Sequence, residues 1–165
     1  MTKAKPLPAI ELLRQRFEYD PQNGSLTWKS NKKQAGNIYK VGHSYYRRIM
    51  VDGRNYFAHR IAYALHTGED PLSMHIDHID GDGLNNSFSN LRLATHAQNI
   101  RNSKRPTSNT SGFKGAYKSR WGRWTARIVI EGKAVHIGTF DTPELAHMAY
   151  CKAAAELHGE FARGS

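Results

Sequence analysis

An eleven-residue polar segment near the middle of the chain limits the folds that this sequence can adopt. Between Arg101 and Ser111 the only apolar side chain is that of Pro106. A segment with nothing to bury cannot contribute to a hydrophobic core and is typical of a linker. The sequence therefore predicts two small modules joined by this linker, within a length of 165 residues.

The composition predicts that both modules fold by packing alone. Hydrophobic residues make up 39% of the chain and charged residues 23%, which is enough apolar material for packed cores. No apolar run approaches the ~20 residues that cross a bilayer, and Met1 to Pro8 has no hydrophobic signal stretch. The single Cys151 can form neither an internal disulfide nor a cysteine-rich zinc site. We expect a soluble protein that is not exported and does not contact a membrane.

The positive charge is concentrated in one part of the second module. The chain has a net charge of +10, and residues 112–136 hold six basic side chains against Glu131 alone. Residues 137–165 hold two basic and four acidic side chains. Segregation of this kind favours a surface that lies on phosphates, so nucleic acid is the favoured partner. A basic solvated face with no partner remains the alternative.

The N-terminal region shows the pattern of two short helices and a β-hairpin. Apolar residues at helical spacing predict a helix from Pro8 to Tyr19, and turn formers follow it. Residues 45–51 and 54–57 flank Asp52-Gly53 and predict a β-hairpin. A second helix is predicted for residues 59–66, ending at Gly68.

The second module has the pattern of three strands followed by one helix. Two glycine turns interrupt the β-rich runs between Gly112 and Phe140, and Thr142-Pro143-Glu144 opens a helix that runs to Gly159. Trp124 and Phe140 are expected in the core, because a small sheet-on-helix module needs large aromatic side chains there. The predicted inward face of the helix consists of Leu145, Met148, Ala149, Ala153 and Leu157.

Residues 75–91 hold an unusual density of acids, histidines and amides. Phosphodiester hydrolysis needs a group that takes a proton from water, and a hard divalent cation that neutralises charge on the phosphate. Imidazole supplies the first function, and carboxylate and amide oxygens bind the cation. Because Mg²⁺ keeps most of its waters, one carboxylate and one amide are sufficient protein ligands.

These residues resemble the HNH endonuclease family, in particular its phage and intron homing branch. The resemblance rests on Asp77-His78-Ile79-Asp80-Gly81-Asp82, Asn85-Asn86, Asn90-Leu91-Arg92, Thr95 and Asn99-Ile100-Arg101-Asn102. In that family two strands and a helix hold one divalent metal ion. By position, the resemblance implies His78 as general base, Asp77 and Asn99 as metal ligands, and Asn90 as the residue that fixes the loop. It also implies Mg²⁺ as cofactor, with Mn²⁺ as a substitute.

The same motif contains side chains that we do not assign to the metal. Asn99 stands where many members of the family have His, which favours an oxygen-only site. The Asp80-Gly81-Asp82-Gly83 run is typical of a turn, so its acids are left out of the metal set. Six other residues keep open roles: His59 and His66 are expected to be packed or solvated, His75 and His96 flank the motif, and Arg92 and Asn102 lie close enough to assist phosphate binding.

The second module resembles the Apetala-two DNA-binding domain, known from plant ethylene-responsive factors. The resemblance covers residues 112–162 and rests on Phe113-Lys114-Gly115-Ala116-Tyr117, Trp121-Gly122-Arg123-Trp124-Thr125-Ala126-Arg127-Ile128, His136 to Ala146 and Ala149-Tyr150. In that family a three-stranded sheet enters the major groove and a helix braces it. Lys114, Trp121 and Arg123 match DNA-contact positions of the family. Arg127 stands where plant members usually have Glu, and we count it with the DNA-binding residues.

Together these features predict an α+β chain with four parts. They are a helix and hairpin region (1–70), a ββα-metal HNH nuclease module (71–104), a linker (105–111) and an Apetala-two-like domain (112–163), a three-stranded antiparallel sheet on one helix. Residues 45–48 form either additional DNA-contacting surface or a packed hairpin with solvated arginines.

The predicted function is site-directed, metal-dependent cleavage of double-stranded DNA in the cytoplasm of a bacterium or of a phage-infected cell. A monomer with one site would nick one strand. The alternatives are a DNA-binding transcriptional regulator with a non-catalytic HNH module and an RNA-binding protein.

Overall fold

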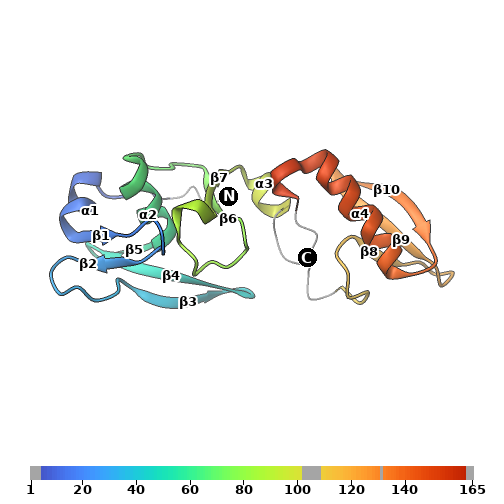
Figure 1. Ribbon diagram of the computed structural model, residues 1–165, viewed down its shortest axis with the longest axis horizontal. Coiled ribbons are helices and arrows are strands. Elements are labelled where there is room, and N and C mark those ends of the chain that lie inside the picture. The colour runs from blue at the N-terminus through green and yellow to red at the C-terminus, as the bar shows by residue number, and fades with distance from the viewer. Residues whose placement is uncertain (1–4, 102–108, 131, 163–165) are drawn as a thin grey trace. The chain divides into compact units, whose positions relative to one another are not determined.

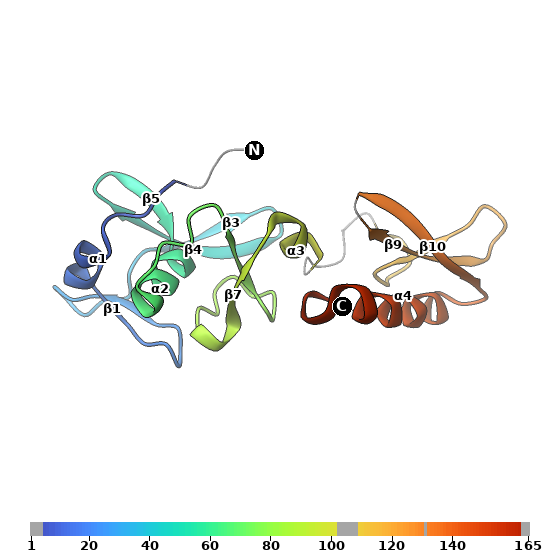
Figure 2. The ribbon, with the colours of Figure 1, turned by 90° about the horizontal axis from the view of Figure 1, so that it is seen from above.

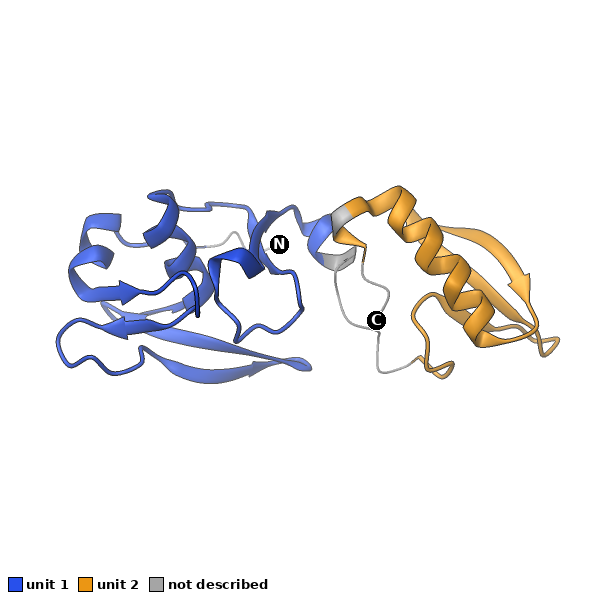
Figure 3. Ribbon diagram, viewed as in Figure 1, with its two compact units in different colours: residues 1–99 blue, residues 100–165 orange. Residues whose placement is uncertain are grey.

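The computed structural model describes residues 5–101, 109–130 and 132–162, and the chain divides into two compact units, residues 1–99 and 100–165 (Figure 3). The first unit contains α1 (Ile10–Arg16), β1 (Phe17–Tyr19), β2 (Leu26–Trp28), β3 (Asn37–Val41), β4 (Ser44–Val51), β5 (Arg54–Phe57), α2 (Ala58–Thr67), β6 (His75–His78), η1 (Phe88–Asn90) and β7 (Leu91–Ala94) (Figure 1). Helix α3 (His96–Arg101) crosses the boundary, and the second unit contains β8 (Ala116–Lys118), β9 (Trp124–Ile130), β10 (Lys133–Phe140), α4 (Pro143–His158) and η2 (Gly159–Phe161). Residues 102–108, which include Asn102 and most of the predicted linker, lie outside the described residues.

Helix α1 is shorter than the sequence pattern predicts. It ends at Arg16, and the next three residues form β1, which pairs antiparallel with β2. Phe17 is buried there, and its ring lies 4.4 Å from that of Trp28. The turn between the strands closes through Gly24, whose amide donates to the carbonyl of Asp20 at 2.9 Å. Strand pairing therefore overrides the helical spacing at the end of α1.

The hairpin of β4 and β5 forms as predicted, and β3 adds a third strand on its other side in the order β3-β4-β5. One face of this sheet packs against α1, β1, β2 and α2. The core there consists of Leu13, Phe17, Leu26, Ala35, Ile49, Val51, Tyr56, Ala58 and Ile61. Strand β3 was not predicted from the sequence. All five of its residues are exposed, so no face of the strand is buried in a core.

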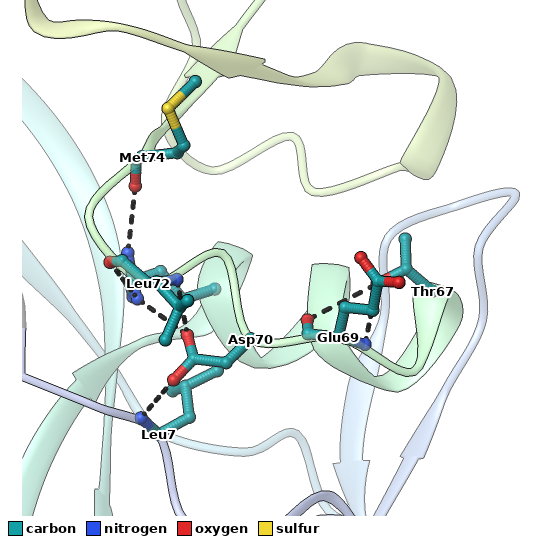
Figure 4. A network of polar contacts seen from close by, with 7 residues as sticks. Leu7, Thr67, Glu69, Asp70, Leu72 and Met74 are labelled. Carbon is teal, nitrogen blue, oxygen red and sulfur yellow. Dashed lines mark hydrogen bonds and ion pairs between the residues drawn. The ribbon is translucent and has the colours of Figure 1, made fainter.

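Helix α2 fixes the strand that carries the candidate site. It ends at Gly68, which adopts the left-handed conformation expected of a C-cap. The segment that follows is held by Asp70, which accepts from the backbone amides of Leu7 and Leu72 and from buried Arg60 (Figure 4). Arg60 also donates to the carbonyls of Leu72 and Met74. These bonds connect α2 rigidly to the start of β6.

Strands β6 and β7 form a separate two-stranded antiparallel sheet beside α2 (Figure 2). Ala62 of α2 packs against Ile76 of β6 and Leu91 of β7 in a small second core. Helix α3 begins two residues after β7 ends. The first unit therefore has two cores that share α2.

The second unit is a three-stranded antiparallel sheet, in the order β10-β9-β8, that packs on α4. Trp124 and Phe140 pack against its core, as predicted. The chain is thus mixed α and β with a later antiparallel sheet and helix. Among the described residues, no helix is both long enough and apolar enough to span a membrane.

The buried face of α4 differs from the prediction. Leu145, Met148 and Leu157 are 46%, 65% and 52% exposed, whereas Ala146, Tyr150 and Ala154 are buried at i, i+4 and i+8. The sheet approaches α4 closely at Gly115, where a Cβ atom would lie 2.1 Å from Cγ of Tyr150. Small side chains and one flat ring fit this spacing, and the larger aliphatic side chains do not.

Candidate active site and nucleic-acid surfaces

The candidate active site is built on the end of β6. Asp77 and His78 are the last two residues of that strand, and both are buried, at 4% and 5% exposure. Asp77 pairs in register with Arg92 of β7, and His78 pairs with Leu91. Because neighbouring residues on a strand point to opposite faces, the two side chains have different surroundings.

Arg92 holds the carboxylate of Asp77. Its Nε donates to Oδ2 of Asp77 at 2.9 Å, and its Nη2 lies 2.8 Å from the same oxygen. Both side chains are buried, so the guanidinium matches the charge of the carboxylate in a site shielded from water. From the sequence, Arg92 was predicted only to lie close enough to assist phosphate binding. The structure shows that it contacts Asp77.

The imidazole of His78 is oriented by Asn86. Nε2 of His78 lies 3.1 Å from Oδ1 of Asn86. An amide oxygen has no proton to give, so this bond requires Nε2–H and leaves the lone pair of the neutral ring on Nδ1. Burial lowers the pKa of His78, against the opposing effects of Asn86 and of the carboxylates of Asp80, Asp77 and Asp82. The ring is therefore neutral at pH 7 and able to accept a proton.

Two further rings enclose His78. The ring of His59, from the first turn of α2, lies 5.0 Å from that of His78, and the ring of Tyr46 lies 6.1 Å away. His59 also stacks on Phe57 at 5.2 Å. Burial, followed by the charges of His78 and Arg60, holds the pKa of His59 well below 6.5. His59 was expected to be packed or solvated, and the structure shows it packed. Its contact with His78 has no sequence signal, because 18 residues separate them.

Asn90 organises the loop between β6 and β7. Its Oδ1 accepts from the amide of Asp80 at 3.0 Å, and its Nδ2 donates to Oδ1 of Asp80 and to the carbonyl of Asn85. The backbone carbonyl of Asn90 also accepts from the amide of Ile79 at 2.9 Å. These bonds close the loop around one buried amide side chain.

The acids of this loop bind the loop itself. Asp80 accepts from the amide of Asp82 and from the side chains of Asn85 and Asn90, and Asp82 accepts from the amide of Leu84. Burial raises the pKa of Asp80, but these hydrogen bonds outweigh it and lower the pKa overall. The contacts agree with the turn interpretation of both acids.

Two neighbouring segments support the loop. The hydroxyl of Tyr19 donates to the carbonyl of Asn86 at 2.8 Å, and a Cβ atom on Gly24 would lie 2.3 Å from the backbone of Asn86. On another side, a Cβ atom on Gly83 would lie 2.5 Å from the carbonyl oxygen of Tyr45 and from the ring of Tyr46. Loop 79–87 is therefore in close contact with β4 and with the turn between β1 and β2.

The remaining predicted residues of the motif lie on α3 and at the ends of the strands. Asn99 is half-buried on α3. Its backbone N–H donates to the carbonyl of Thr95 at 3.0 Å. His75 and His96 are exposed, with ring centroids 5.3 Å apart. His66 packs on Phe88 at 3.7 Å.

The donor set of the motif suits a hard cation. Within the described ranges, no group of three or more His, Cys, Asp or Glu side chains is placed to hold a metal ion. A site made of the carboxylate of Asp77 and the amide oxygen of Asn99 is of a different kind, with oxygen ligands that suit Mg²⁺ or Mn²⁺. The buried carboxylate of Asp77, fixed in place by Arg92, fits such a site.

The predicted DNA-binding residues lie on different parts of the second unit. Arg127 is exposed on β9, with its guanidinium 5.9 Å from the ring of Tyr117 on β8. Trp121 lies between those strands and is 75% exposed, with the guanidinium of Arg120 4.0 Å from its ring. Arg123, next to the same turn, forms an exposed ion pair with Asp141 at 3.0 Å.

Lys114 lies apart from these residues along the chain. It precedes β8, and its backbone carbonyl accepts from Nδ1 of His147 on α4 at 2.8 Å.

Comparison with known proteins matches both halves of the chain to families. A family model described as HNH endonuclease matches residues 56–101, and one described as AP2 domain matches residues 111–160. The first match begins in β5, so it includes α2 and His59. No solved structure matches the chain.

Two viral proteins are similar to more than half of the chain. Protein 3.8 of Escherichia phage T7 is 41% identical over 97 residues, which are 58% of this chain and 79% of that protein. The Uncharacterized HNH endonuclease L560 of Acanthamoeba polyphaga mimivirus is 41% identical over 105 residues, which are 63% of this chain and 54% of that protein.

A plant protein is similar over a shorter stretch. Ethylene-responsive transcription factor ERF084 of Arabidopsis thaliana is 41% identical over 66 residues, which are 39% of this chain and 26% of that protein.

Proposed function

The chain belongs to the HNH endonuclease family and carries an AP2 domain after its HNH domain, and on this basis we propose that it is a site-directed, metal-dependent DNA endonuclease of the homing type. The observation that carries the proposal is the buried, neutral His78 at the end of β6, with Asn86 orienting its ring and Asp77 preceding it in the strand. In this proposal β6, β7 and α3 form a ββα-metal module.

His78 acts as the general base. Its Nδ1 takes a proton from the water molecule that attacks the phosphorus atom of the scissile phosphodiester. The hydrogen bond to Asn86 keeps the other ring nitrogen protonated, so that the basic nitrogen is Nδ1. Burial supports this role, because a lowered pKa keeps His78 unprotonated at neutral pH.

Asp77 and Asn99 would hold the divalent metal ion, Mg²⁺ or Mn²⁺. When bound, the ion supplies charge neutralisation at the phosphate and at the departing oxygen. Arg92 holds the carboxylate of Asp77 in a fixed orientation. Asn90 keeps the loop closed, which fixes the carbonyl end of β6 and with it the backbone of His78.

The second unit supplies affinity for double-stranded DNA. In this proposal Lys114, Trp121, Arg123 and Arg127 contact DNA, and the exposure of Trp121 and Arg127 supports the assignment. If the protein acts as a monomer with one such active site, it cuts one strand in each binding event. A transcriptional regulator with an inactive HNH module is the alternative, and the presence of all four motif residues argues against it.

The proposal is tested on supercoiled plasmid DNA. Purified protein is incubated with plasmid in Mg²⁺, in Mn²⁺ and in EDTA. Nicking or linearisation in either metal and none in EDTA is the expected result, and the product shows whether one strand or two are cut. Metal affinity is measured separately by titration calorimetry, where Asp77→Asn should weaken Mn²⁺ binding. Cleavage that persists in EDTA would contradict the proposal.

A further inference from the structure

The sheet β3-β4-β5 has one face that the core does not use. Ile49, Val51 and Tyr56 point into the core, so the alternate residues point the other way. Strand register places Asn37 and Phe57 beside Arg48, Tyr39 beside Tyr46, and Asn55 beside Met50. We call these residues the outer face: Asn37, Tyr39, Tyr46, Arg48, Met50, Asn55 and Phe57.

The outer face begins at the candidate active site. The ring of Tyr46 lies 6.1 Å from that of His78 and 5.6 Å from that of Phe57. Arg48 follows on the same strand, with its guanidinium 4.4 Å from the ring of Tyr39 and 5.8 Å from that of Phe57. From Tyr46 to Met50 the strand extends about 13 Å, roughly the axial length of four nucleotides of one DNA strand.

A polar depression lies at the far end of this face. Its volume is about 400 Å³, and it is lined by Trp28, Asn31, Lys33, Gln34, Gly36, Asn37, Arg48, Met50 and Asn55. Two cations, four amides and one large aromatic ring line it, and no carboxylate does. Among the residues that the structure describes, no carboxylate forms an ion pair with Arg48 or Lys33.

The charge around this face suits a polyanion. Residues 28–57 contain seven Lys and Arg side chains, of which Lys33 and Arg48 line the depression, and one acid, Asp52. That acid is paired with Arg16 at 2.7 Å, away from Arg48. Unpaired cations beside exposed aromatic rings and amides are the features of a nucleic-acid surface: cations bind phosphates, and Asn and Gln read base edges.

We propose that the outer face binds the DNA duplex on one side of the scissile phosphate. Arg48 and Lys33 contact phosphates within about four nucleotides of the cut, and the amides at the depression contact base edges there. This inference rests on the proposed nuclease function for its position relative to the cut. The nuclease module would then contribute to recognition independently of the AP2 domain.

The test measures DNA binding by the full chain in a His78→Ala background, so that the result does not depend on cleavage. The test variant is Lys33→Gln with Arg48→Gln. The matched control is Lys40→Gln with Arg54→Gln, which removes the same charge from the opposite face of the same sheet. Fluorescence anisotropy with a labelled duplex is recorded at several salt concentrations between about 50 and 200 mM.

We expect the test variant to lower the slope of log K against log salt by about 1.8, since each lost phosphate contact lowers it by about 0.9. The control should change the slope by less than about 0.45, which corresponds to half of one phosphate contact. Lys33→Gln alone, at an exposed side chain, should lower the slope by about 0.9 and guards against misfolding of the double variant.

An unchanged slope in the test variant, or an equal fall in the control, would overturn the proposal. Plasmid cleavage by the protein with His78 intact separates the two claims. Intact cleavage with an unchanged slope refutes only the claim that the outer face binds DNA. A lowered slope without any cleavage refutes only the claim that the protein is a nuclease.

Discussion

Nε2 of His78 lies 3.1 Å from Oδ1 of Asn86, eight residues further along the chain. This bond selects the ring nitrogen that can act as a base, and it is made inside a loop whose closure depends on Asn90. The geometry of the base is therefore set by the loop rather than by strand β6 alone.

Replacement of Asn86 tests this relationship. Asn86→Ala removes the acceptor, so we expect cleavage to slow by about 10- to 100-fold while DNA binding is retained. Asn86→Asp keeps the acceptor and adds a negative charge that favours the imidazolium. In that variant the acid limb of the pH–rate profile should move to higher pH. Equal profiles for Asn86→Asp and the unmodified protein would show that Asn86 does not act through His78.

Arg92 is expected to be essential for the stability of the first unit. Arg92→Leu leaves the buried carboxylate of Asp77 without its guanidinium, which should cost about 3 to 5 kcal/mol in the free energy of unfolding. Arg16→Leu is the control, because its ion pair with Asp52 is exposed and should contribute less than about 1 kcal/mol. Urea unfolding followed by circular dichroism measures both changes. Similar losses in the two variants would contradict the difference in burial.

Acid is expected to destabilise the first unit through His59. Its pKa is well below 6.5 in the folded state because the ring is buried, so the unfolded chain binds more protons as the pH falls below 6.5. The contribution of neutral His59 to stability is therefore full above 6.5 and is lost as the pH falls toward the folded-state pKa. Each additional proton changes the free energy of unfolding by about 1.4 kcal/mol per pH unit.

His59→Phe should reduce this dependence, because Phe can stack on Phe57 and does not titrate. Thermal unfolding midpoints at pH 7.5 and pH 5 are compared for both proteins. An identical decrease in both would exclude His59 as the source.

Gly115 is predicted to be required for the fold of the second unit. It adopts φ +77°, and a Cβ atom would overlap the ring of Tyr150. Gly122 has a similar φ of +83° with open space around it, so Gly122→Ala carries only the conformational cost of about 1 to 2 kcal/mol. Gly115→Ala should cost clearly more in chemical unfolding. Equal costs would mean that the ring of Tyr150 moves aside.

The sequence predicted the elements whose signals are local. The β4–β5 hairpin, the end of α2 at Gly68 and the sheet and helix of the second unit follow from turn residues and periodicity. The motif that places Asp77 and His78 together at the end of β6 was also visible, because it is a contiguous run of residues.

The sequence could not predict contacts that depend on how elements pack. His59 meets His78 because α2 lies against the β6–β7 pair, and Arg92 meets Asp77 because of strand register. Three residues of the predicted inward face of α4, Leu145, Met148 and Leu157, are exposed, because size and hydrophobicity favoured them in the prediction. The close approach of the sheet selects Ala146 and Ala154 instead. Ala149 packs against the core, as predicted.

The central claim is that His78 performs the chemistry while other residues bind DNA. The most direct measurement is the single-turnover cleavage rate of plasmid DNA in Mg²⁺, at protein concentrations that saturate binding, for His78→Ala and for His75→Ala as the matched control three residues earlier in β6. The account predicts that His78→Ala lowers the rate by about 10²- to 10⁴-fold with DNA affinity nearly unchanged, while His75→Ala remains within a few-fold. Full cleavage by purified His78→Ala protein would contradict it.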